Sequence, residues 1–197
     1  MTRRALAGPI VACLALVLLL AACVDDATPV GSFDPSTACN GADSQVMKGA
    51  YPDLEAAMPT SLAGVAPTSL VSGRLCSANT LGTLYALGVH ETHFASAVWN
   101  RGGGSGVQLT LMSATGLTVA NVLESYTSGA ANAPKVHSLK TSSITVNGLA
   151  GMRDDIENDD YAQDVVVWPG GGSGLIRVVI TSNIHEPDLQ AALAAFH

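Results

Sequence analysis

The sequence is poor in aromatic residues and in basic residues. Phe, Trp and Tyr account for 5% of its 197 residues, and nine Lys and Arg stand against sixteen Asp and Glu. A protein that binds a polyanion needs clustered Lys and Arg, which release counterions on binding, and here the basic residues are scattered singly. These shortages exclude a nucleic-acid partner and predict a core of small aliphatic side chains. No cofactor-binding motif is recognised, and we expect no cofactor.

The N-terminal apolar segment is too short to span a membrane. Residues 10–22 carry no charge and follow Arg3 and Arg4; thirteen residues make roughly 20 Å of helix, less than the roughly 30 Å hydrocarbon core. This pattern is typical of a secretory signal. The segment ends in Leu20-Ala21-Ala22-Cys23, which resembles the lipobox of bacterial lipoproteins. The resemblance implies that Cys23 receives a diacylglycerol and becomes the N-terminus; an ordinary signal peptide and an uncleaved anchor are the alternatives.

Lipidation of Cys23 predicts that the mature chain is anchored to a membrane without spanning it. Removal of residues 1–22 leaves seven basic and sixteen acidic residues, a formal charge of −9. This charge disfavours docking on anionic headgroups, so attachment would rest on the lipid alone. We expect the domain on the extracytoplasmic face of the cell membrane or in a periplasm, with an unknown protein or small molecule as its further partner.

Cysteine is scarce. Of the four cysteines, Cys13 leaves with the signal and Cys23 is lipidated, so Cys39 and Cys76 remain. Outside the cytoplasm such a pair predicts a disulfide, which would stabilise the fold by about 3–4 kcal/mol in the chain-entropy model. A metal site or catalytic thiols are the alternative, but no His or third Cys stands at metal-site spacing.

Residues 23–50 lack a sustained apolar period and predict a flexible tether, and residues 51–197 form a single domain. The spacing of apolar residues predicts helices over 51–58, 79–87 and 117–128, and another one after Pro187. The string Gly-Gly-Gly-Ser-Gly occurs at 102–106 and at 170–174. Because each copy leads into a strand pattern and not a helix, both copies indicate hairpin turns, not phosphate-binding loops.

Hairpins dominate the expected fold. Asn147-Gly148 is the strongest short hairpin signal, and each glycine string is a second kind of turn. We therefore expect an α+β domain with a mainly antiparallel sheet of six to eight strands and three or four helices on one face. The two Val-Trp pairs before the glycine strings further suggest an internal duplication of strand, hairpin and helix units.

Two candidate sites follow from these patterns. Trp99 and Trp168 precede the two turns equivalently, and two indoles at one end of a sheet could stack a sugar or a peptide; packing against cross-strand neighbours is the alternative. Asp155, Glu157 and Asp159 fall at i, i+2 and i+4 in an acidic run and could hold calcium, although the run lacks the glycine and the twelfth acidic residue of an EF-hand loop. A solvated hairpin tip explains the same residues.

The histidines give a weaker signal. His90 and His93 enclose a short H-x-x-H pattern that could hold zinc or copper, while exposed or hydrogen-bonded histidines are the ordinary expectation. No catalytic residue is assigned. The first hypothesis for function is a non-catalytic binding, sensing or accessory module, and the alternatives are a hydrolase of unrecognised type and a metal-binding lipoprotein.

Overall fold

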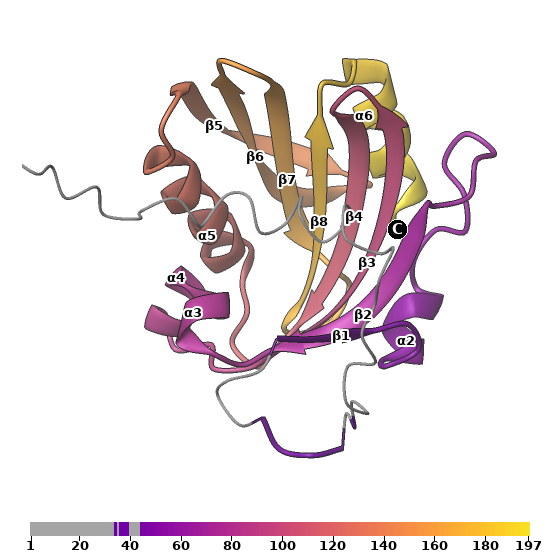
Figure 1. Ribbon diagram of the computed structural model, residues 1–197, viewed down its shortest axis with the longest axis vertical. Helices are drawn as coiled ribbons and strands as arrows, with labels where there is room; N and C mark the ends of the chain where they lie inside the picture. The colour runs from indigo at the N-terminus through magenta and orange to yellow at the C-terminus, as the bar shows by residue number, and fades with distance from the viewer. Residues whose placement is uncertain (1–33, 35, 40–43) are drawn as a thin grey trace, which may run out of the picture.

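The computed structural model describes residues 34, 36–39 and 44–197. Eight antiparallel strands form one sheet in the order β1-β2-β3-β4-β8-β7-β6-β5 (Figure 1). The strands are β1 (Ser44–Met47), β2 (Ser69–Leu75), β3 (Thr92–Gly102), β4 (Ser105–Ser113), β5 (Val136–Val146), β6 (Leu149–Asn158), β7 (Ala162–Pro169) and β8 (Leu175–Ser182). The helices are α2 (Pro52–Ala56), α3 (Ala78–Leu81), α4 (Thr83–Ala86), α5 (Val119–Ala131) and α6 (Glu186–Ala195). The α+β class and the antiparallel sheet are as expected.

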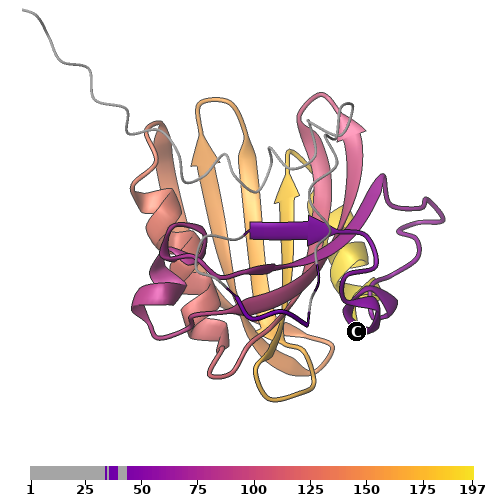
Figure 2. The ribbon, with the colours of Figure 1, turned by 60° about the horizontal axis from the view of Figure 1, so that its bottom comes forward.

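The number and placement of the helices differ from the expectation. The helix expected over 79–87 is two short helices, α3 and α4, because Gly82 takes a positive φ of 52° between them. The described helices also lie on both faces of the sheet (Figures 1 and 2). Helices α2 and α6 cover one face, called the α6 face, and α3, α4 and α5 cover the other, called the α5 face. The prediction of helices on one face is therefore wrong.

Alternation along the strands explains why both faces can be covered. On β4, Val107, Leu109 and Leu111 point to the α6 face, and on β8, Ile176, Val178 and Ile180 point to the α5 face. The central strands thus carry apolar side chains on both sides, which a one-sided sheet would not need. Each apolar surface requires its own helix layer.

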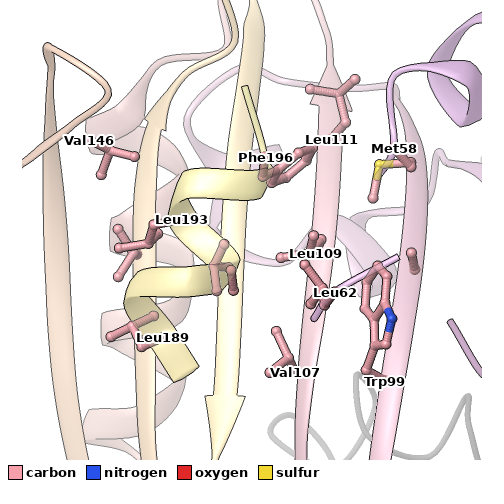
Figure 3. Packing of buried hydrophobic residues seen from close by; sticks show 14 of the residues in the cluster. Met58, Leu62, Trp99, Val107, Leu109, Leu111, Val146, Leu189, Leu193 and Phe196 are labelled. Carbon is pink, nitrogen blue, oxygen red and sulfur yellow. The ribbon is translucent and has the colours of Figure 1, made fainter. Parts of the chain in front are cut away.

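The α6 face holds the larger aromatic side chains. Leu189 and Leu193 on α6, and Phe196 directly after it, pack against β4 and its neighbours (Figure 3). Phe196 meets Trp168 edge to face, with ring centroids 5.7 Å apart. The i, i+3, i+4, i+7 stripe expected after Pro187 is thus the buried side of α6.

The sheet is two four-stranded meanders joined between β4 and β8. Each meander contains one glycine string as a hairpin turn, between β3 and β4 and between β7 and β8. Because β4 and β8 run antiparallel, with Gly106 opposite Ser182 and Ser113 opposite Leu175, the two turns lie at opposite ends of the sheet. The hairpin at Asn147-Gly148 joins β5 and β6, with φ values of 50° and 80°, as two-residue hairpins of this type require.

The sheet begins before Tyr51, the expected start of the domain. β1 pairs with β2 within the segment that the sequence predicts to be tether, with Val46 opposite Gly73. Val46 packs on the apolar cluster of the α5 face. One partly buried valine in a polar context produces no sustained period, so the pattern does not reveal this strand.

Candidate functional site at the β5 edge

β5 is a long strand at the edge of the sheet. Ten of its eleven residues pair with β6, with a register shift at His137, and no other strand pairs with β5 among the residues that the structure describes. Ser, Thr, Val and Ile supply most of its residues, Lys140 is its one charged residue apart from His137, and it contains neither Gly nor Pro. Such an edge presents a row of backbone N–H and C=O groups that can pair with another extended chain.

The opposite edge of the sheet differs in length. β1 has four residues. Cys39, which precedes β1 in the chain, is at disulfide distance from Cys76, which follows β2; the two Cα atoms are 5.9 Å apart, as the expected bridge requires. Short edge strands are one of the ways in which proteins avoid unwanted pairing. At about 3.3 Å per residue, β5 offers an edge of about 36 Å.

A buried carboxylate holds β5 in place beneath α5. Asp154 on β6 is fully buried and accepts hydrogen bonds from Thr127 of α5 at 2.6 Å and from Thr141 of β5 at 2.5 Å. A buried carboxylate needs such donors, so the three residues join the helix, the edge strand and its neighbour. The sequence places Asp154 in an acidic run; Met152 and Ile156 at two residues on either side are the signal that its side chain points inward.

A hollow lies beside β5 on the α5 face, near the β5–β6 hairpin. Its volume is about 420 Å³, and it is bounded by the first residue of α5, by the end of β5 and by the start of β6. The residues that line it are Val119, Ser143, Ile144, Thr145, Ala150, Gly151 and Met152. None of these side chains is charged, and two carry hydroxyls, so the hollow suits an apolar group with hydroxyl partners at its rim.

The three acidic residues proposed for calcium do not converge. Asp155 accepts a hydrogen bond from Arg153 at 2.6 Å, and Asp159 pairs with His137 at 2.5 Å. Glu157 is exposed on β6. In the described part of the chain the one group of three potential ligands that lie close together is Cys39, Cys76 and Glu91, and its two cysteines are the disulfide pair.

Arg153 joins three carboxylates on the α6 face. It donates to Asp155, to Asp164 at 3.0 Å and to Glu186 of α6 at 3.0 Å. Burial raises the pKa of the Asp164 carboxyl, although Thr181 and Arg153 lower it. The hydrogen bond from Arg153 lowers the pKa of Glu186. This network connects the N-terminus of α6 to β6 and β7, and a structural role explains it.

Trp99 and Trp168 are placed in the core. Trp168 is fully buried and Trp99 is 4% exposed, both on the α6 face. The Trp99 indole donates a hydrogen bond to the Val65 carbonyl at 2.8 Å. Trp99 on β3 and Trp168 on β7 precede turns at opposite ends of the sheet, so the structure does not bring them together as a stacking surface.

A second hollow, of about 490 Å³, lies at the start of α2. His93 and Ser113 both line it, and they are directly opposite each other on β3 and β4. The His93 ring stacks on Tyr51 with centroids 4.4 Å apart, and its Nε2 lies 2.9 Å from a Glu91 oxygen. His90 instead contacts Tyr85, so the two histidines of the H-x-x-H pattern have different ring partners.

No family model, curated protein or solved structure matches the chain. Among the helices that the structure describes, none combines the length and the apolar character that crossing a bilayer requires. Cys23 lies outside the described residues.

Proposed function

We propose that the chain is a non-catalytic binding module that captures an extended segment of a partner protein by strand addition at β5. The observation that carries this proposal is the eleven-residue strand β5, whose outer edge has no partner strand among the described residues. An added strand would satisfy the outward backbone groups of β5, and main-chain hydrogen bonds would supply affinity. A net contribution of about 0.5–1.5 kcal/mol per hydrogen bond makes several such bonds sufficient for a measurable complex.

The module is anchored by lipid in this proposal. The lipobox-like Leu20–Cys23 supports a diacylglycerol on Cys23 and a domain on the extracytoplasmic side of the membrane. The test is a Cys23→Ala variant, expressed in a bacterium fed with an alkyne-tagged palmitate. Wild type is expected to incorporate the label and to sediment with membranes; equal labelling of the variant would contradict the anchor. The matching order of strands in the two meanders supports the proposed internal duplication.

Strand addition is tested with a random twelve-residue peptide library displayed on phage and the full chain purified in detergent. Successive N–H groups of a strand point to opposite sides, and proline has no N–H group. Of the two variants Ser142→Pro and Ser143→Pro, one therefore removes a donor from the outer edge of β5, and the other removes a donor to β6. Thermal melting identifies the variant that keeps the fold. Selected peptides are expected to lose at least tenfold in affinity for that variant. Peptides that bind both proteins equally would exclude β5 as the site.

The alternative, a hydrolase, is favoured by one arrangement. Ser113 is directly opposite His93 in the β3–β4 pair, and His93 pairs with Glu91. Serine, histidine and glutamate are the residue types of a nucleophile, a base and an orienting acid. The test is reaction of the full chain with a fluorophosphonate, followed by mass spectrometry. One adduct on Ser113 that His93→Ala abolishes would support the alternative, and no adduct would eliminate a serine hydrolase.

A further inference from the structure

The hollow beside β5 has the position of a side-chain pocket for an added strand. Ser143 and Thr145 are alternate residues of β5 and line the hollow, as do Ala150 and Met152 on β6. A strand added to β5 would lie about 4.8 Å away and send every second side chain to the same face. Diagonal neighbours in a sheet are within reach of long side chains, so one residue of the incoming strand would be directed over the hollow.

The lining determines what that residue is. Val119 and Met152 offer aliphatic and thioether surface on the α5 face, and no lining side chain carries a charge. A charged group would lose its hydration there without a partner. Met152 can adapt to different shapes because its side chain is unbranched and flexible. A volume of about 420 Å³ accommodates an aromatic or large aliphatic side chain.

Charge distinguishes a foreign partner from a second copy of this chain. The end of β6 carries Glu157, and the turn after it carries Asp159 and Asp160, which pair with His137 and Lys135 beside the start of β5. The whole chain has a formal charge of −7. A second copy would bring the same negative charge to the edge, whereas a basic segment would meet opposite charge.

We propose that the partner is an extended, basic segment that places one large apolar side chain, such as Phe or Leu, in the hollow between β5, β6 and the first residue of α5. This inference rests on the proposed strand addition and adds the chemistry of the ligand. The hydrogen bonds of the edge give affinity for any extended chain, and the hollow selects among such chains.

The test starts from the peptides that the β5 edge selects. A peptide with an apolar residue at a recurrent position is synthesised with that residue and with Ala in its place. Binding is measured by fluorescence anisotropy to full-length wild type and to Ala150→Phe, which fills the hollow. Ala131→Phe, at an exposed residue near the end of α5, is the matched control. If Ala150→Phe does not fold, Thr145→Phe replaces it.

The Ala peptide is expected to bind wild type at least tenfold more weakly, and the difference is expected to fall below twofold in Ala150→Phe but to persist in Ala131→Phe. Higher salt is expected to weaken binding of the basic peptides. Edge-dependent peptides without a recurrent apolar residue, or insensitive to Ala150→Phe, would overturn the pocket and leave strand addition standing. Loss of all edge dependence would remove the proposed function as well. A dimer in sedimentation, lost in the proline variant, would assign the edge to a second copy.

Discussion

The two meanders have the same order of strands but differ at their outer strands and in their helices. β1 has four residues and β5 has eleven, although each begins its meander. α5 follows β4 and packs on one face, while α6 follows β8 and packs on the other. In both meanders, the local sequence pattern of a strand, a glycine turn and a strand forms the same kind of hairpin. The side on which the following helix packs depends on which apolar surface is still uncovered, which is a property of the assembled sheet.

The tryptophans test whether the two halves share one core. Trp168→Ala and Trp99→Ala each remove a buried indole from the α6 face. Both are expected to lower the free energy of unfolding by about 3–5 kcal/mol, the usual range for large aromatic truncations. Urea unfolding followed by circular dichroism measures the change. A loss below about 1 kcal/mol in either variant would mean that the corresponding half does not depend on the shared core.

The two glycine turns differ in what their glycines do. A Cβ on Gly174 would lie 2.1 Å from the Ala114 carbonyl oxygen, and its φ is 69°. Gly104 has a φ of 77°, but the nearest atom to its Cβ, from Asn183, is 3.8 Å away. Gly174→Ala is therefore expected to cost about 2–4 kcal/mol, from strain and a backbone clash, and Gly104→Ala about 1–2 kcal/mol from backbone strain alone.

Chemical denaturation of the two glycine variants gives the comparison directly. Gly172→Ala serves as the control, because its φ is not positive and only the Leu175 side chain, at 3.8 Å, approaches its Cβ. Equal losses in Gly174→Ala and Gly104→Ala would show that the two turns are interchangeable and that the approach of Gly174 to Ala114 has no energetic weight.

The hairpins could be predicted from the sequence because their signals are local. Asn147-Gly148 and the two glycine strings are turns as expected. The second helix layer could not be read, because it depends on contacts between distant segments. The split at Gly82 could not be read either, because a single glycine inside a helical pattern is often tolerated. The candidate site shows the same division: the strand pattern of β5 is local, but its place at the edge is decided by the pairing of β4 with β8. The acidic run does not indicate that α5 buries Asp154, although Met152 and Ile156 on either side indicate that its side chain points inward.

Each meander contributes one arginine that forms an ion pair with a carboxylate in the first turn of α6, and the two arginines differ in burial and in number of partners. Arg153, on β6 of the second meander, pairs with three carboxylates, and its side chain is 19% exposed. Arg101 of the first meander has one ion pair among the described residues, with Asp188, and its side chain is 39% exposed. Arg153→Ala is expected to cost about 1–3 kcal/mol, since it leaves partly buried carboxylates without their cation. Arg101→Ala is expected to cost about 0.2–1 kcal/mol, as exposed pairs do. Thermal melts at pH 7 rank the two, and a larger loss for Arg101→Ala would refute the ordering.

The smallest expected effect is the pH dependence of α6 docking. The pKa of Glu186 is lowered by its hydrogen bond with Arg153, so the folded state binds that proton more weakly than the unfolded state. Its contribution is fully present above the unfolded value of about 4.5 and is lost as pH falls through the folded pKa. Burial raises the pKa of Asp164, so that group acts in the opposite direction, and stability falls as pH rises above about 3.8.

Glu186→Gln is expected to flatten the acid-side loss by less than about 1 kcal/mol, because the Glu186 carboxylate is half exposed. Asp164→Asn is expected to remove the opposing slope. Urea midpoints between pH 3 and 7 measure both, and identical slopes in wild type and both variants would mean that the helix docks independently of these charges.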